Sequence, residues 1–211
     1  MFPLIRQIST RVTPALAATP LTANQVTAAS LLFGLACNWA IMQGGWTWTA
    51  TGAALLFVSY VLDNCDGEIA RLKDQCTEFG DRFDTFVDWL VNAGFFAALG
   101  IGTAAGSGEA IWLWLGWAAA AGATLNYFIG LIIEARQGGA LTADETPGKE
   151  PVTRREWIVY FFRELARADF CFIVLALASL DLTWVLLPVG AVGAQVYWAT
   201  HFIRGAGGYH V

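Results

Sequence analysis

Long apolar stretches alternate with short polar ones along most of the chain. Six of these stretches have about 20 residues or slightly more, which is the length that a helix needs to cross the hydrocarbon core of a bilayer. They cover residues 25–43, 46–66, 82–103, 110–134, 157–180 and 184–203. The pattern predicts an all-α fold, an integral membrane bundle of six transmembrane helices that forms a single domain over residues 1–211.

Residues 1–20 have a different pattern, in which apolar and polar positions alternate over short distances. The apolar positions include Phe2, Leu4, Ile5, Ile8 and Val12, and the polar ones include Arg6, Gln7 and Arg11. Such a pattern is typical of a short amphipathic helix that lies in the membrane interface. No long apolar core follows the two arginines within this segment, so we do not expect a cleaved signal peptide.

The basic residues predict the orientation of the bundle. All 12 Lys and Arg residues lie before the first stretch, between the second and third, from the end of the fourth into the first half of the fifth, or after the sixth. With six spans, these places all face the same side of the membrane. The positive-inside rule therefore predicts a multi-pass protein of the cell membrane with both termini in the cytoplasm.

Composition supports a membrane protein and excludes one class of partner. Hydrophobic residues make up 56% of the chain and charged residues only 14%, whereas soluble domains carry nearer a quarter. The net charge of −5 and the pI of about 4.9 argue against nucleic-acid binding, which needs a basic face. The four cysteines have neither zinc-like nor disulfide spacing, so we interpret them as unpaired and non-catalytic.

Four aspartates stand at the edges of two apolar stretches. Asp63 and Asp66 are three residues apart and Asp84 and Asp88 are four apart, so each pair shares one face of a helix. An antiparallel helix pair joined by residues 67–80 brings the two faces together. Carboxylates gathered in a partly dry site repel one another unless cations neutralise them. Oxygen ligands of this kind suit Mg²⁺, Mn²⁺ or Ca²⁺. Many enzymes that catalyse displacement at phosphorus bind a pair of such ions.

The acidic residues alone are also compatible with a cation transporter or a proton pathway. The residues next to them favour phosphate chemistry instead. Gly67 and Gly80 let a ligand approach the backbone closely, and Arg71 is a fixed cation suited to a diphosphate. An EF-hand aligned on Gly67 would place Leu62 and Lys73 at ligand positions, which excludes that site. We expect Glu68, Asp74 and Asp81 to be solvated loop charges.

In order, these residues read D-x-x-D-G-x-x-A-R from Asp63 to Arg71, then eight residues, Gly80, three residues, Asp84, three residues and Asp88. The order resembles the signature of the CDP-alcohol phosphotransferase (phosphatidyltransferase) family at each of its eight fixed positions. The layout of six spans is similar to that family as well.

The resemblance implies a reaction and a set of metal ligands. Family members transfer a phosphate-linked group from a CDP-alcohol to a second alcohol and release CMP. Asp63, Asp66 and Asp84 would bind two divalent cations, Mg²⁺ or Mn²⁺. Asp88 would bind metal and act as the general base on the acceptor hydroxyl. A homodimer is implied by the resemblance alone, whereas the positive-inside rule already predicts that the Asp-rich segment faces the cytoplasm.

The resemblance also implies a pocket for the cytidine diphosphate group. Its lining would be Gly67, Ala70, Arg71, Thr77 and Gly80. A weaker match is LTANQVT, which keeps Asn24 and Thr27 of the family pattern but has Ala23 where proline is usual. The same residues are compatible with a simple helix N-cap at Thr22 or Asn24.

The acceptor alcohol is the substrate about which the sequence says least. Arg163 and Arg167 are four residues apart on the fifth stretch and, with Arg155, are candidates to bind an anionic acceptor such as inositol phosphate or glycerol phosphate. Alternatively, Arg163 and Arg167 mark the membrane interface and pair with Glu164 and Asp169.

Together these observations predict a membrane transferase of phospholipid or polar-lipid biosynthesis, with CDP-diacylglycerol as the expected donor. A metal-dependent membrane phosphohydrolase and a cation transporter are the alternatives. Transport gives no reason for the glycines or for the Ala70–Arg71 pair.

Overall fold

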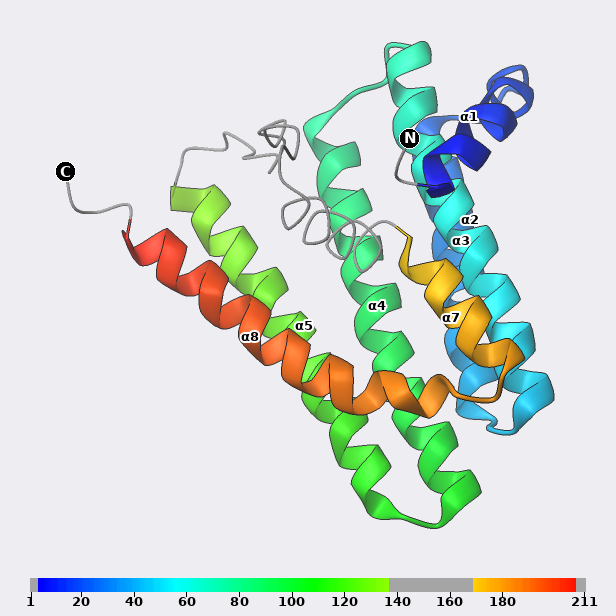
Figure 1. Ribbon diagram of the computed structural model, residues 1–211. Helices are drawn as coiled ribbons and strands as arrows, with labels where there is room; N and C mark the ends of the chain where they lie inside the picture. Colours follow the sequence, from blue (N-terminus) through cyan, green and yellow to red (C-terminus); the bar gives the residue numbers. More distant parts are fainter. Residues whose placement is uncertain (1–3, 137–168, 208–211) are drawn as a thin grey trace, which may run out of the picture.

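The computed structural model describes residues 4–136 and 169–207, and every regular element in these two ranges is a helix (Figure 1). The elements are α1 (Leu4–Ala17), α2 (Ala23–Met42), α3 (Trp46–Leu72), α4 (Glu78–Ser107), α5 (Ala110–Arg136), α7 (Phe170–Ser179), the 3₁₀ turn η1 (Thr183–Val185) and α8 (Leu186–Gly207). The all-α prediction is confirmed for this part of the chain.

Three of the described helices are long and apolar enough to cross a membrane. They are α2, α4 and the segment Ala110–Ala135 of α5. α7 and the segment Thr183–Val196 are shorter apolar helices. Because residues 157–168 of the fifth predicted span lie outside the described residues, the count of six spans stays a prediction. The apolar helices indicate a membrane protein.

The long helices pack side by side in the order α3, α2, α4, α5 and α8. α2 lies along α3, and α4 contacts α2 on one side and α5 on the other (Figure 1). α8 packs against α5, and α7 and α1 both pack against α3. Small residues allow the close approach that membrane helices use in place of a hydrophobic driving force. A Cβ added to Gly102 would lie 2.3 Å from the Ile41 carbonyl oxygen, and one added to Gly100 would lie 2.9 Å from the Gly116 Cα.

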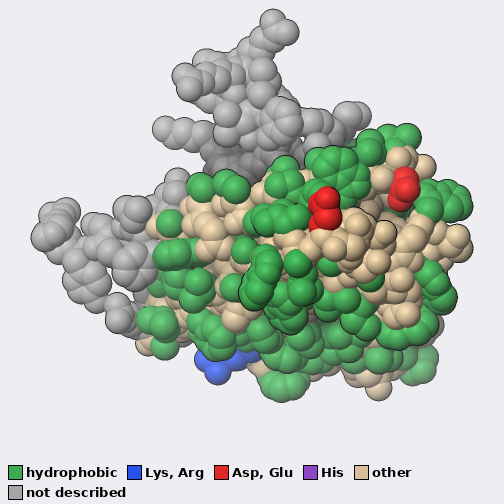
Figure 2. All heavy atoms as spheres, turned by 90° about the horizontal axis from the view of Figure 1, so that it is seen from below, with side chains coloured by type: hydrophobic (Ala, Val, Ile, Leu, Met, Phe, Trp, Pro, Cys, Tyr) green, Lys and Arg blue, Asp and Glu red, His purple; other side chains and the backbone are tan. Residues whose placement is uncertain are grey.

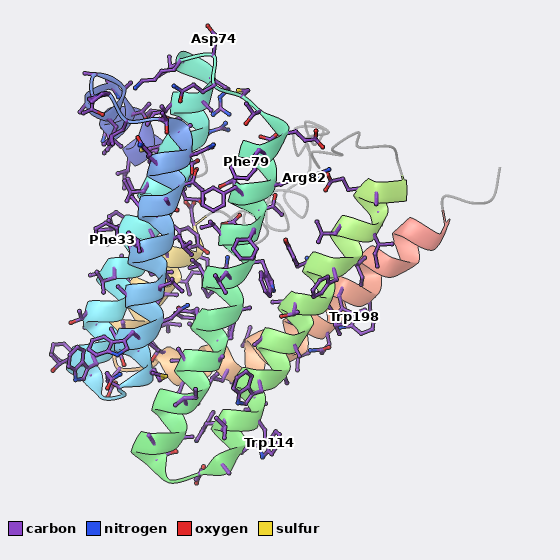
Figure 3. The ribbon with its side chains drawn as sticks, turned by 180° about the vertical axis from the view of Figure 1, so that it is seen from behind. Phe33, Asp74, Phe79, Arg82, Trp114 and Trp198 are labelled. Atoms are coloured by element: carbon purple, nitrogen blue, oxygen red, sulfur yellow. The ribbon has the colours of Figure 1, made fainter. Side chains whose placement is uncertain are left out.

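The two ends of the molecule differ in character. Asp74 lies at the tip of the α3–α4 connection, and Trp114 lies at the opposite end (Figure 3). That opposite end is covered mainly by hydrophobic side chains (Figure 2). Its indole rings pack edge to face, with centroid distances of 5.3 Å for Trp39–Trp48 and 5.6 Å for Trp112–Trp184. Tryptophans gathered at one level are typical of a membrane–water boundary.

The connection between α3 and α4 is shorter than the sequence pattern predicted. α3 continues to Leu72 and α4 begins at Glu78, so residues 73–77 rather than 67–80 join them. The polar residues after Asp66 are good helix formers and extend α3 beyond its apolar part. Thr77 then caps α4, its Oγ1 accepting a hydrogen bond from the Gly80 backbone N–H at 3.1 Å. The short connection keeps the two Asp-bearing turns close together.

The N-terminal helix is confirmed as α1, although its position relative to a bilayer stays a prediction. Its buried face is less apolar than expected, because Ser9 and Thr13 share it with Ile5. The first turn of α1 is capped by Asp169, whose carboxylate accepts hydrogen bonds from the Leu4 and Ile5 backbone N–H groups, both at 2.9 Å. Asp169 is fully buried.

We expect Asp169→Ala to destabilise the protein, because two buried or partly buried N–H groups would lose their acceptor. The cost is about 2 kcal/mol, as is typical for unsatisfied buried donors. The thermal unfolding midpoint of the purified protein in detergent measures it. Glu109→Ala, at an exposed carboxylate beyond α4, is the matched control. An Asp169→Ala midpoint equal to that of the control would contradict the capping role.

Candidate active site

Three of the four predicted metal ligands meet between α3 and α4. Asp63 and Asp66 on α3 and Asp84 on α4 each offer a carboxylate oxygen, and these oxygens all lie within 4.8 Å of one another. A cation that binds two of these oxygens, each at about 2.1 to 2.5 Å, fits between oxygens at such separations. α3 and α4 run antiparallel and are joined at this end by the short connection of residues 73–77, which produces the grouping that the spacing predicted.

The chemistry of the three carboxylates fits a divalent cation. Asp66 is buried, and Asp63 and Asp84 are partly buried. Asp66 Oδ2 and Asp84 Oδ1 are buried and have no hydrogen-bond partner among the described residues. A buried charged oxygen without a partner is costly. A bound cation would satisfy both oxygens and remove the mutual repulsion of the carboxylates.

Asp88 lies one turn beyond Asp84 on α4, and its side chain is exposed rather than part of the group of three. Asp88 lies close enough to Asp63 for the two carboxylates to repel each other when both are ionised. On the following turn, Asn92 Nδ2 donates to the Asp88 carbonyl at 2.8 Å, and Tyr60 on α3 donates to Asn92 Oδ1 at 3.1 Å. The role of Asp88 as ligand and base stays a prediction.

A small cavity with a volume of about 50 Å³ opens beside the carboxylates. Its lining consists of Ala23, Asn24, Thr27, Asp66, Gly67, Ala70, Gln75, Cys76, Thr77, Gly80, Asp81 and Asp84. The cavity therefore brings together six of the seven residues predicted for the cytidine diphosphate group. The seventh, Arg71, is exposed and lies beside Gly67, where an added Cβ would be 3.5 Å from Arg71 Nη1.

The start of α2 positions Asn24. Thr22 is the N-cap, with its Oγ1 accepting from the Gln25 N–H at 3.3 Å while Gln25 Oε1 accepts from the Thr22 N–H at 3.0 Å. The capping role therefore belongs to Thr22. Asn24 is left to face the cavity, with Oδ1 3.2 Å from where a Cβ on Gly80 would lie.

Two residues that the sequence analysis did not single out tie the α3–α4 connection to the start of α2. Gln75 Oε1 accepts from the Ala23 N–H at 2.9 Å. Lys73 Nζ donates to the carbonyls of Thr19 and Leu21, both at 2.8 Å. These contacts hold together the side of the cavity that is formed by the start of α2 and the α3–α4 connection. They join residues more than 50 positions apart, for which periodicity gives no signal.

Arg82 connects the first turns of α4 with the end of α5. It pairs with Glu78 at 2.7 Å and approaches Glu134 with Nε at 3.5 Å, pointing from α4 toward α5 (Figure 3). Further along α4, Trp89 Nε1 donates to Thr124 Oγ1 at 3.2 Å, and its ring stacks on Tyr127 with a centroid distance of 4.8 Å. α5 thus supports the face of α4 that lies away from α2.

The predictions for the remaining polar residues have different outcomes. The candidate acceptor residues Arg155, Arg163 and Arg167 lie outside the described residues. Asp74 is exposed in the α3–α4 connection, as expected. Asp81 is exposed as well, but it lies on α4 and lines the cavity instead of lying in a loop. The interpretation of Glu68 as a solvated loop charge is wrong, because it lies on α3 and accepts two hydrogen bonds from α1. The four cysteines are unpaired.

Comparisons with known proteins agree with this site. The sequence profile described as CDP-alcohol phosphatidyltransferase matches residues 20–202, which include both Asp pairs and the whole cavity lining. A protein of Aquifex aeolicus (strain VF5) described as "Bifunctional IPC transferase and DIPP synthase" is 34% identical over 96 residues. The match covers 46% of this chain but only 21% of that relative. On the extent of the family match, the chain belongs to the CDP-alcohol phosphatidyltransferase family.

Proposed function

We propose that this protein transfers a phosphate-linked group from a CDP-alcohol to the hydroxyl of an acceptor alcohol and releases CMP. The observation that carries the proposal is the position of three carboxylates at the edge of a cavity lined by family motif residues. Two of these carboxylates have a buried oxygen with no hydrogen-bond partner within residues 4–136 and 169–207. Family membership supports the same reaction.

Asp63, Asp66 and Asp84 hold the divalent cations, Mg²⁺ or Mn²⁺, in this proposal. When bound, these ions polarise the β-phosphate and neutralise charge on the departing CMP. Asp88 takes the proton of the acceptor hydroxyl, since an alcohol is a poor nucleophile until it loses that proton. The acceptor oxygen forms a bond to the β-phosphorus, and the bond from that phosphorus to the bridging oxygen of CMP breaks.

The cavity residues hold the nucleotide. Asn24, Thr27 and Thr77 supply polar groups, and Gly67, Ala70 and Gly80 leave room for the ligand. Arg71 beside Gly67 supplies a positive charge for the diphosphate.

Filling this space is expected to weaken donor binding. We expect Gly80→Val to raise the KM for the CDP-linked donor at least tenfold, which corresponds to about 1.4 kcal/mol. Even a single Cβ there would lie 3.2 Å from both Asn24 Oδ1 and Thr77 Oγ1. Steady-state CMP release at varied donor concentration measures the effect. Gly130→Val on α5, where an added Cβ meets nothing within 4 Å, is the control. Equal KM values for the two variants would place the nucleotide elsewhere.

The apolar helices favour a lipid-linked donor, and CDP-diacylglycerol is the donor we propose. The distribution of basic residues favours an integral protein of the cell membrane with the site and both termini in the cytoplasm. Arg155, Arg163 and Arg167 are the proposed contacts of an anionic acceptor, and a homodimer is the proposed assembly.

CMP release from purified protein in detergent tests the proposal. The assay contains Mg²⁺ or Mn²⁺ and CDP-diacylglycerol, with inositol phosphate, glycerol 3-phosphate, serine or inositol as acceptor. CMP that forms only with one acceptor supports the transferase and identifies that acceptor. Equal CMP release without any acceptor would favour the phosphohydrolase, and cation flux in liposomes without CMP formation would favour the transporter.

A further inference from the structure

The N-terminal helix α1 is joined to α3 through both oxygens of one carboxylate. Ser9 Oγ donates to Glu68 Oε1 and Thr13 Oγ1 donates to Glu68 Oε2, each at 2.6 Å. Ser9 is fully buried and Thr13 is 2% exposed. Hydrogen bonds to a charged acceptor in such surroundings are short and strong. The Glu68 carboxylate is thereby fixed on the α1 side of α3.

α1 is itself held in place by a second carboxylate from a distant part of the chain. The Asp169 cap fixes its first turn, and Glu68 fixes its middle. The sequence profile of the family begins at residue 20, so α1 lies outside the matched region. The contacts between α1 and Glu68 therefore add to the features that the family pattern describes.

Glu68 stands inside the motif, two residues after Asp66 and three before Arg71. Positions two apart on a helix are about 200° apart around its axis, so Asp66 and Glu68 point to opposite sides of α3. The site lies on the Asp66 side and α1 on the Glu68 side. Holding Glu68 against α1 therefore fixes the rotation of the last turns of α3 and, with it, the direction of Asp66.

We propose that Glu68, through Ser9 and Thr13, is a positioning residue that sets the direction of Asp66 for cation binding. The proposal rests on the function proposed above. It makes α1 a supporting part of the active site rather than only a membrane contact. Groups that orient metal ligands from outside the coordination sphere typically contribute 10–100-fold to metal affinity.

Glutamine at this position separates positioning from charge. The amide side chain accepts from one hydroxyl through its Oε1 and donates to the other through its Nε2, because a hydroxyl both donates and accepts. Glu68→Gln therefore keeps the contact with α1 and removes the charge, whereas Glu68→Ala removes both. If the charge of Glu68 acted directly on the cations, the two variants would be impaired to the same degree.

The experiment compares the full-length protein with Glu68→Gln, Glu68→Ala and the double variant Ser9→Ala/Thr13→Ala. Thr10→Ala is the control, since Thr10 is exposed and its hydroxyl donates to the Gln7 carbonyl oxygen within α1. Mn²⁺ affinity is measured by electron paramagnetic resonance without substrate, and donor KM and kcat by CMP release. We expect Glu68→Ala and the double variant to bind Mn²⁺ about tenfold more weakly with a raised donor KM, and Glu68→Gln to stay within about threefold of the unmodified protein.

Unchanged Mn²⁺ affinity and KM in Glu68→Ala, below its thermal unfolding midpoint, would overturn the proposal. So would a Glu68→Gln variant as impaired as Glu68→Ala. If Glu68→Ala does not fold, the single variants Ser9→Ala and Thr13→Ala test the positioning role instead, because each removes one of the two hydrogen bonds. An unmodified protein that binds Mn²⁺ but releases no CMP would refute the proposed function, while the Mn²⁺ measurements would still test the role of Glu68.

Discussion

Asp84→Asn is expected to remove both Mn²⁺ binding and CMP release. Asp84 is the contribution of α4 to the group of three carboxylates, and its Oδ1 is buried without a hydrogen-bond partner among the described residues. An amide leaves a neutral oxygen where a cation needs a charged one. If the cations supply about 4 kcal/mol of transition-state stabilisation, their loss lowers kcat/KM about 1000-fold. Mn²⁺ titration and CMP release measure the two effects separately.

Asp81→Asn is the matched control for this prediction. Asp81 lies three residues earlier on α4, is exposed and lines the same cavity without belonging to the group of three. We expect it to change Mn²⁺ affinity less than threefold, as for an exposed charge screened by solvent. An Asp84→Asn variant that behaves like Asp81→Asn would show that the carboxylate group is structural.

Within residues 4–136 the predicted helices correspond to those of the structure, because long apolar stretches give a strong compositional signal. Where the structure differs, the reason is that a helix does not end where its apolar part ends. α3 continues through Glu68 and Arg71 to Leu72. A hydropathy pattern ends a span at the first charges, whereas helix propensity and the cap at Thr77 determine where the backbone leaves the helix.

The site was predictable to the extent that it depends on spacing within two neighbouring helices. Asp63, Asp66 and Asp84 meet because the helices that carry them follow one another, run antiparallel and are joined by the short connection of residues 73–77. The contacts of Glu68 with Ser9 and Thr13 are different, because they join residues 59 and 55 positions apart. A single hydrogen bond across such a distance leaves no periodic pattern, and a charged residue next to a motif is most simply interpreted as solvated.

Thr77 shows how one residue meets two requirements. The family resemblance assigned it to the nucleotide pocket, and the structure places it both in the cavity lining and at the N-cap of α4. Its Oγ1 accepts from the Gly80 N–H, so the cap also fixes the glycine that faces Asn24. Local capping and the shape of the cavity therefore depend on the same side chain.

Asp88→Asn is expected to stop turnover while leaving most of the Mn²⁺ affinity. Asp88 lies outside the group of three carboxylates and its side chain is exposed, where an acceptor hydroxyl can reach it. A general base typically contributes 10²–10⁴-fold, so we expect kcat to fall about 1000-fold. Because Asp63, Asp66 and Asp84 are unchanged, Mn²⁺ affinity should fall much less than in Asp84→Asn.

The comparison of the two variants assigns the role of Asp88. Mn²⁺ binding by electron paramagnetic resonance and CMP release are measured on the same preparations of Asp84→Asn and Asp88→Asn. Loss of turnover with Mn²⁺ binding retained identifies Asp88 as the base. A loss of Mn²⁺ affinity as large as that of Asp84→Asn would instead make Asp88 an essential cation ligand, and the acceptor proton would then need another base.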